Sequence, residues 1–187
     1  MRAFLAIALP EDARNSLTAL QEDLADSRAD VKWVEPQHLH VTLKFLGEIT
    51  DEQRRVIERL LAEVARDETT FTLGLERVEA FPSLSSPRVV WVGLGEGKER
   101  AIRLAERVEQ GADGLGFRKE ARPFAAHVTL GRVRTPRRQA ALVQALRGCA
   151  WRPPASWTVS ALTLYQSVLS SSGPSYRVLA EVPLKSD

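Results

Sequence analysis

The tetrapeptide His-Val-Thr-Leu occurs twice in this chain, first at residues 40–43 and again at residues 127–130. In an extended strand, residues two positions apart project from the same face. The histidine and threonine of each copy would therefore point one way, and the valine and leucine the other. The spacing predicts two pairs of candidate site residues, which are His40 with Thr42 and His127 with Thr129.

Two imidazoles and two hydroxyls that converge on one cleft are suited to phosphodiester cleavage. Because imidazole has an unperturbed pKa of about 6.5, one ring can take a proton from water while the other gives one to a leaving oxygen. Threonine hydroxyls can donate hydrogen bonds to phosphate oxygens, and Arg132 can add a charged contact two residues past the second copy. A strained five-membered cyclic phosphate could be cleaved by these groups without a metal.

The same residues allow structural interpretations. A single His-x-Thr in a strand is most often structural, but two identical copies that use two of the three histidines favour a shared site. His38 would share the face of His40, and a metal pair there is conceivable. No suitably spaced carboxylate or cysteine partner is evident, so we expect no metal, and His38 is interpreted as a rim or structural residue.

Arginines gather after the second copy, at positions 132, 134, 137 and 138. They are interpreted either as solvated residues at the start of a helix or as a patch for an RNA backbone. Arg132 itself is either a phosphate contact or a surface charge. The four tryptophans are candidates for the core or the rim, and one of them could stack a base. The glycines of GLGEGK at residues 93–98 lack the spacing of a phosphate-binding loop.

Strand and helix signals alternate around the two copies. Apolar patterning predicts strands at residues 2–9, 31–34, 39–46, 70–80, 87–94, 126–133, 157–167 and 175–184. It predicts helices at about 11–24, 51–64, 98–112 and 136–147, the third of them broken by Gly111, Gly114 and Gly116. The stretch FPSLSSP at 81–87 predicts a loop.

Several predicted strands follow one another without a helix, which favours antiparallel pairing and an α+β fold. No linker rich in proline, glycine or serine divides the chain, so we expect one domain with two lobes over residues 1–187. With 44% hydrophobic and 27% charged residues, the composition is that of a globular protein. A net charge of +2 means that contact with nucleic acid must come from a local patch.

The single cysteine, Cys149, excludes a disulfide within the chain, makes a thiolate zinc site improbable and fits a reducing cytoplasm. The apolar run after Arg2 ends at Pro10, which is typical of a strand rather than a signal peptide. No apolar stretch reaches the roughly 20 residues that span a bilayer. We expect a cytoplasmic protein without a membrane partner.

With these residues in hand, the sequence resembles the two-histidine (2H) phosphoesterase superfamily. More narrowly, it is similar to the bacterial and archaeal RNA 2',3'-cyclic phosphodiesterases, also called 2'-5' RNA ligases. The resemblance covers nearly the full length and includes VKWVEPQHLHVTLKFLGEI, GFRKEARPFAAHVTLGRV and LTLYQSVLSSSGPSYRVLAEVPL. It implies two similar lobes related by a pseudo-twofold, with antiparallel sheets lining a central cleft and helices outside. It also implies hydrolysis of RNA 2',3'-cyclic phosphate to a 2'-phosphomonoester without metal or cofactor.

By position, the resemblance implies a role for each candidate residue. His40 matches the general acid for the leaving 3'-oxygen, and His127 matches the general base for water. Thr42, Thr129 and Arg132 match the residues that bind the phosphate. The near-symmetry of the two copies makes the acid and base roles exchangeable on paper.

Two alternatives compete with this hypothesis. A binding module could use the same cleft to hold RNA ends or nucleotides without turnover, although binding alone needs no acid–base pair. A different enzyme of the superfamily could act on a small cyclic nucleotide. We expect a monomer whose substrates are RNA ends or cyclic nucleotides.

Overall fold

The computed structural model describes residues 1–171 and 173–186. Its strands are β1 (Arg2–Ala8), β2 (Val31–Trp33), β3 (His40–Glu48), β4 (Phe71–Leu73), β5 (Leu75–Ser83), β6 (Ser86–Leu94), β7 (His127–Val133), β8 (Trp157–Val159), β9 (Ala161–Ser170) and β10 (Gly173–Pro183). Its α-helices are α1 (Glu11–Ala25), α2 (Asp51–Arg66), α3 (Lys98–Gly114) and α4 (Gln139–Arg147), with a short 3₁₀-helix at Pro36–His38. None of the helices in this part of the chain combines the length and apolar character that crossing a membrane requires.

Two four-stranded antiparallel sheets form the centre of the molecule. The first has the strand order β10-β9-β1-β3, and the second has the order β2-β7-β6-β5. A third, two-stranded sheet pairs β4 with β8. The predicted α+β class with antiparallel sheets is therefore confirmed.

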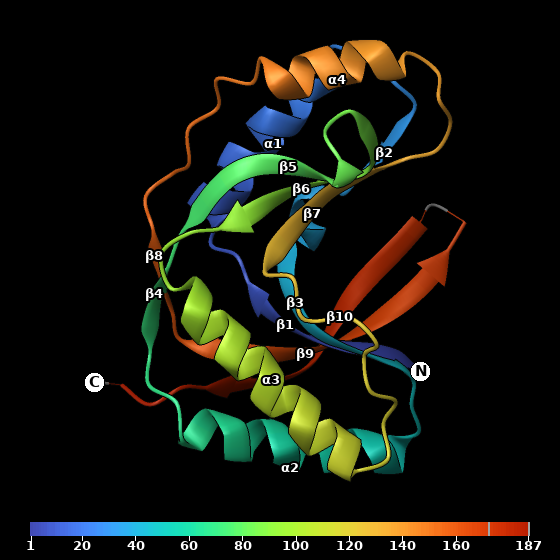
Figure 1. The fold of residues 1–187 in the computed structure, drawn as a ribbon. Helices are drawn as coiled ribbons and strands as arrows, with labels where there is room; N and C mark the ends of the chain where they lie inside the picture. Colours follow the sequence, from blue (N-terminus) through green and yellow to red (C-terminus); the bar gives the residue numbers. More distant parts are fainter. Residues whose placement is uncertain (172, 187) are drawn as a thin grey trace.

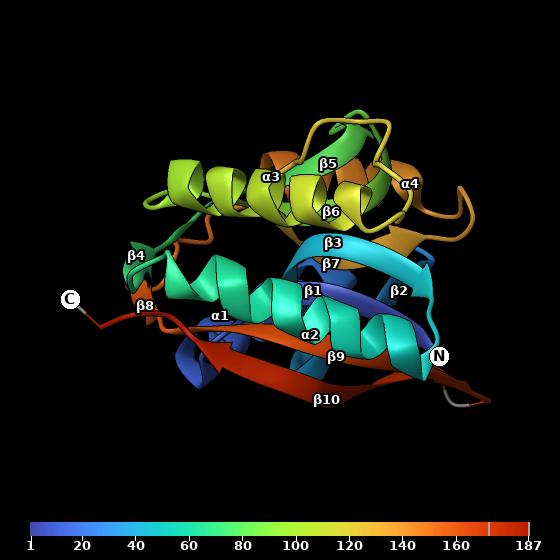
Figure 2. The same ribbon diagram turned by 90° about the horizontal axis from the view of Figure 1, so that it is seen from below.

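The helices lie on the outer faces of the two sheets, with α1 and α4 at one end of the molecule and α2 and α3 at the other (Figure 1). Helix α3 contacts β3, and α2 contacts β9 and β10. On the other side, the buried Gln21 amide of α1 donates hydrogen bonds of 2.8 Å to the carbonyls of Val34 and Leu130. We call the first sheet with α2 and α3 the first lobe, and the second sheet with α1 and α4 the second lobe. Seen from below in Figure 2, α2 lies between α3 on one side and strands β9 and β10 on the other.

In each lobe, one helix follows a strand of the other lobe in the chain. Helix α1 leaves β1 of the first sheet and packs on the second, while α3 leaves β6 of the second sheet and contacts β3 of the first. The apolar stripe predicted on α1 is buried, at Ala13, Leu17, Leu20 and Leu24. This exchange gives the two lobes one continuous hydrophobic core.

Two predicted strands are each split in the structure. The segment 70–80 divides at Gly74 into β4 and β5, and the segment 157–167 divides at Ser160 into β8 and β9. The Gly74 N–H donates to the Glu96 carbonyl at 2.9 Å, and its own carbonyl accepts from the Gly95 N–H at 2.9 Å. The short strands that precede the two breaks, β4 and β8, then pair with each other.

The loop predicted at residues 81–87 is wrong. This stretch forms the end of a β5-β6 hairpin, and only residues 84 and 85 make the turn. Pro82 is tolerated because β5 is the edge strand of its sheet, where a missing N–H breaks no ladder on the open side. The Ser86 N–H donates to the Ser83 hydroxyl at 3.2 Å and closes the turn.

Two helix boundaries also differ from the prediction. Helix α3 is not broken at Gly111 but continues to Gly114. A β-carbon at Gly111 would meet the Leu60 side chain, so the glycine allows α2 and α3 to approach closely. Helix α4 begins at Gln139 rather than 136, since Arg138 has a φ of 53° and cannot continue a helix backwards.

Candidate active site

The two His-Val-Thr-Leu copies lie at the start of β3 and of β7, which belong to different sheets but contact each other. The aliphatic residues of both copies are buried, at Val41, Leu43, Val128 and Leu130. The histidines and threonines on the alternate positions are only half-buried. The alternation expected from the sequence thus occurs in both strands, and it places the polar face of each copy near the junction of the lobes.

His40 is held at both ring nitrogens. Its Nδ1 lies 2.6 Å from the carbonyl oxygen of His38, and its Nε2 lies 2.8 Å from the Thr42 hydroxyl. A carbonyl oxygen only accepts, so Nδ1 must carry the hydrogen. In the neutral ring Nε2 therefore accepts a hydrogen bond from Thr42.

His127 has the same tautomer but a different environment at Nε2. Its Nδ1 lies 2.5 Å from the Ala125 carbonyl, again two residues earlier in the chain, and therefore carries the hydrogen. Over residues 1–171 and 173–186, the His127 Nε2 atom has no hydrogen-bond partner. Its lone pair is available to take a proton from a bound water.

Both histidines have a lowered pKa. Burial lowers the pKa of His40, and the positive charges of His38 and His127 lower it further. Burial also lowers the pKa of His127, with a further contribution from the Arg132 guanidinium. The charge of His127 thus affects the pKa of His40 although the two residues lie in different halves of the sequence. In the free protein both are shifted toward the neutral form.

Aromatic side chains surround both imidazoles. The His40 ring centroid lies 4.8 Å from that of Phe4 and 5.5 Å from that of Tyr176. The His127 centroid lies 5.5 Å from Phe81 and 5.6 Å from Trp91. These rings exclude water from the faces of the histidines, which is the burial that lowers their pKa values.

Sequence reasoning missed the aromatic neighbours of His40. Alternation in residues 161–184 could indicate which face Tyr165 and Tyr176 occupy, but not that β9 pairs with β1 and so brings Tyr165 opposite Phe4. Burial raises the pKa of both tyrosines, so both remain protonated phenols at neutral pH. The Arg132 charge partly offsets this rise at Tyr176, which places a second-lobe cation near a first-lobe phenol.

Arg132 differs from two of the arginines that follow it. It is exposed and forms no ion pair with any residue that the structure describes. In contrast, Arg134 pairs with Asp30 at 3.2 Å, and Arg138 donates to the Ser27 carbonyl at 2.9 Å. Arg134 and Arg138 are therefore engaged with their own lobe, while Arg132 remains available to an anion.

Lys44, the basic residue directly after the first copy, is buried away from solvent. Its ammonium lies 2.8 Å from the Glu109 carboxylate on α3 and 3.0 Å from the Arg118 carbonyl. The other Glu109 oxygen accepts the Glu120 N–H at 2.9 Å. Lys44 thus joins the first motif strand to the segment that leads into His127.

His38 packs its ring against Tyr176, with centroids 4.5 Å apart, and its Nδ1 lies 3.9 Å from Glu35. Across the described part of the chain, no three or more histidine, cysteine, aspartate or glutamate side chains are grouped as metal ligands would be.

Comparison with known proteins gives a consistent result. The family model described as LigT like Phosphoesterase matches residues 7–91 and again residues 92–176, so each match contains one His-x-Thr copy. The RNA 2',3'-cyclic phosphodiesterase of Archaeoglobus fulgidus is 37% identical over 96% of this chain and 98% of its own. That of Aeropyrum pernix is 36% identical over 89% and 93%.

Solved structures match over nearly the whole chain as well. TT0787 of Thermus thermophilus superposes with a TM-score of 0.82 at 31% identity and covers 100% of both chains. E. coli LigT complexed with 3'-AMP has a TM-score of 0.77 at 28% identity, covering 98% of this chain and 97% of its own.

Proposed function

Since this chain belongs to the LigT like phosphoesterase family, we propose that it hydrolyses RNA 2',3'-cyclic phosphate ends with His40 and His127 as the acid–base pair. The observation that carries the proposal is the shared tautomer of the two rings. Each donates its Nδ1 hydrogen to a backbone carbonyl two residues earlier, which leaves Nε2 for chemistry in both copies. Curated relatives with this activity match the chain over most of its length.

His127 is the general base in this mechanism. Its Nε2 takes a proton from a water molecule, and the resulting nucleophile forms a bond to phosphorus on the side opposite the 3'-oxygen. The unpartnered Nε2 supports this assignment, because no competing hydrogen bond must be broken first.

His40 is the general acid. Its Nε2 gives a proton to the 3'-oxygen as the bond between that oxygen and phosphorus breaks, so the phosphate remains on the 2'-oxygen. Burial lowers the pKa of His40 and shifts the free protein toward the neutral ring. To act as the acid, His40 must therefore gain a proton in the complex with substrate. The negative charge of a bound cyclic phosphate raises that pKa and favours the protonated ring.

Thr42, Thr129 and Arg132 bind the phosphate. When His40 becomes protonated, Nε2 no longer accepts from Thr42, and the Thr42 hydroxyl hydrogen is released to a phosphate oxygen. Arg132, which has no carboxylate partner within the described residues, supplies the positive charge. A 5'-hydroxyl in the place of water would form a 2'-5' linkage with the same groups.

A single chain supplies both copies of the motif, so the site needs no second subunit. On this ground we propose that the protein acts as a monomer. The RNA substrate and the single cysteine support action in the cytoplasm.

The test is to incubate the protein with an oligoribonucleotide that ends in a 2',3'-cyclic phosphate, in excess chelator, and to identify the product isomer. We expect a 2'-phosphate. His40→Ala and His127→Ala should each lower kcat by ~10²–10⁴-fold, with circular dichroism verifying that both variants fold.

Each other outcome identifies a specific failure. A 3'-phosphate product would mean that the leaving oxygen is wrongly assigned. Near-normal kcat in either variant would remove that histidine from the reaction. Tight binding without turnover by the wild-type protein would favour a binding module instead.

A further inference from the structure

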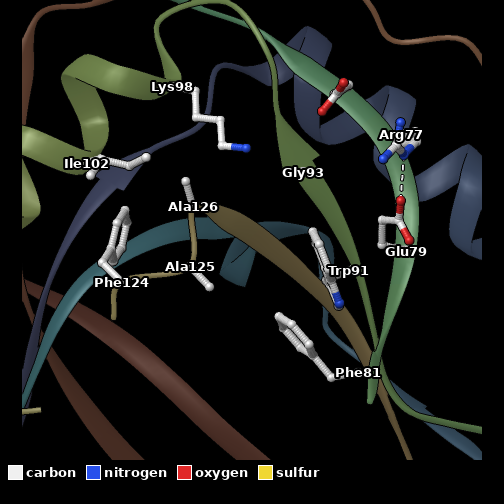
Figure 3. Close-up of a pocket in the computed structure, with 11 residues that line it drawn as sticks. Arg77, Glu79, Phe81, Trp91, Gly93, Lys98, Ile102, Phe124, Ala125 and Ala126 are labelled. Atoms are coloured by element: carbon white, nitrogen blue, oxygen red, sulfur yellow. Dashed lines mark hydrogen bonds and ion pairs between the residues drawn. The ribbon is translucent and has the colours of Figure 1, made fainter. Parts of the chain in front are cut away.

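A cavity of about 260 Å³ is lined by residues of β5, β6, α3 and the segment before β7 (Figure 3). It shares walls with the candidate active site, since Phe81 and Trp91, which line it, also contact the His127 ring edge-on. Ala125, whose carbonyl accepts the His127 Nδ1 hydrogen, lines it as well. A group bound in this cavity would therefore contact side chains that pack on the His127 ring.

The cavity has aromatic walls and the size of one heterocycle. Trp91 and Phe124 stand on opposite sides of it in Figure 3, and Trp91 is held in place by stacking on Phe81 with centroids 4.6 Å apart. Pockets for drug-sized ligands measure roughly 300–1,000 Å³, so this one is too small for a whole nucleotide. Aromatic rings bind bases of any sequence by stacking.

Two exposed charged side chains, Lys98 and Glu76, also line this cavity. The Lys98 ammonium extends into it in Figure 3. The Glu76 carboxylate lies over Gly93, where a β-carbon would be 3.8 Å from Oε2 and 3.5 Å from the Trp91 ring. Within the described residues, neither the Lys98 nor the Glu76 side chain forms a hydrogen bond or ion pair, whereas the neighbouring Arg77 and Glu79 pair with each other.

We propose that this cavity binds the base of the nucleoside that carries the cyclic phosphate, and that it selects guanine. The proposal rests on the function proposed above and names its preferred substrate. Guanine presents two adjacent donors, N1–H and N2–H₂, which match the two oxygens of Glu76, and its O6 and N7 acceptors match Lys98. Adenine, cytosine and uracil offer no such pair of neighbouring donors to a carboxylate.

The test compares the four nucleoside 2',3'-cyclic monophosphates by kcat/KM. The ratio of the guanosine to the uridine substrate should be ~10–100 in the wild-type protein, as a bidentate base contact provides. Glu76→Gln removes one acceptor and should lower this ratio about tenfold, and Lys98→Met should also lower it. Glu63→Gln makes the same chemical change on an exposed residue of α2 outside the cavity and should leave the ratio unchanged.

A ratio near one in the wild-type protein, or an unchanged ratio in Glu76→Gln, would overturn the proposal while leaving the proposed hydrolysis intact. Calorimetric titration with guanosine 2'-monophosphate separates the two proposals if turnover is absent. Binding that is tighter than for uridine 2'-monophosphate and weakened in Glu76→Gln would then support the cavity and contradict the catalysis. Equal binding of the two mononucleotides would overturn the cavity.

Discussion

At the scale of single residues, two backbone carbonyls determine which nitrogen of each motif imidazole is left without a hydrogen. The carbonyls of His38 and Ala125 bind the Nδ1 hydrogens, so both rings present Nε2. The rings differ at Nε2, since that of His40 lies 2.8 Å from the Thr42 hydroxyl and that of His127 has no hydrogen-bond partner among the described residues. This difference supports distinct acid and base roles for two identical tetrapeptides.

The pH dependence of hydrolysis should follow from the lowered pKa of both histidines. The base must be neutral, so activity falls as pH drops through the pKa of His127. The acid must be protonated, so activity also falls as pH rises through the pKa of His40. Since both pKa values are lowered in the free protein, the bell-shaped profile of kcat/KM should have its maximum below about pH 6.5.

The profile of kcat should lie at higher pH than that of kcat/KM. It reports the complex with substrate, in which the phosphate anion raises both pKa values. Initial rates across pH 4–9 (roughly the range of histidine titration) measure both profiles. A maximum of kcat/KM well above pH 7, or a kcat profile displaced to lower pH, would contradict the two buried imidazoles.

Replacement of Arg132 should affect both binding and the pH profile. Arg132→Met removes a cation from the phosphate and should lower kcat/KM by ~10²-fold. The same change removes one cause of the lowered pKa of His127, so the acid limb should move to higher pH. Arg132→Lys keeps the positive charge but loses the planar set of guanidinium N–H donors. Its acid limb should therefore stay in place, and its kcat/KM should lie between those of Arg132→Met and the wild type. Identical acid limbs in wild type and Arg132→Met would contradict this electrostatic coupling.

At the scale of elements, the ion pair between Lys44 and Glu109 links the two motif strands. It fastens β3 to α3 and, through Glu120, to the segment before β7. The equivalent position four residues after His127 is Gly131, where a β-carbon would lie 2.7 Å from the Val31 side chain. In the second lobe, β2 packs against Gly131. In the first lobe, the buried Lys44 side chain occupies the equivalent position.

Lys44→Met should destabilise the protein strongly. The Lys44 side chain is fully buried, and its loss leaves the Glu109 carboxylate without its cation, which costs about 3 kcal/mol of unfolding free energy. Urea denaturation measures this change. The exposed pair of Arg66 and Asp67 provides the control, since Arg66→Met should cost less than ~0.5 kcal/mol. The double variant Lys44→Met/Glu109→Leu should recover most of the loss, and a Lys44→Met cost no larger than that of Arg66→Met would contradict the role of this ion pair.

The sequence predicted some strands of the fold correctly and others incorrectly. Strands with strict alternation, such as those that begin at His40 and His127, were predicted because one face of each is buried. The breaks at Gly74 and Ser160 could not be predicted, since they depend on β4 and β8 meeting across the chain. The proline-rich hairpin was mistaken for a loop because its edge position in the sheet is not visible in sequence. The cavity near His127 was not predicted, because only the fold brings together Glu76 of β5, Lys98 of α3 and Phe124 of the segment before β7.

At the scale of the whole molecule, the repeat in the sequence and the sheets of the fold have different boundaries. The first family match ends at residue 91, inside β6. The first sheet takes β1 and β3 from the first half of the chain and β9 and β10 from the second. The second sheet likewise combines β2 and β5 with β7. Neither half contains all the strands of one sheet.

We therefore propose that the two lobes are one domain and unfold in a single cooperative transition. Trp33 and Trp91 lie in the second sheet, and Trp151 donates a hydrogen bond to Ser16 of α1. In a Trp157→Phe variant, tryptophan fluorescence therefore reports mainly the second lobe, while far-UV circular dichroism reports both lobes. In urea, the two signals should give the same midpoint, because one continuous hydrophobic core includes residues of both sheets and of the helices that cover them. Fragments 1–91 and 92–187 should each be unfolded alone and should regain the dichroism of the intact chain when mixed. Separate midpoints, or a fragment that folds alone, would show that the lobes are independent and that the shared core does not bind the two histidines into one rigid site.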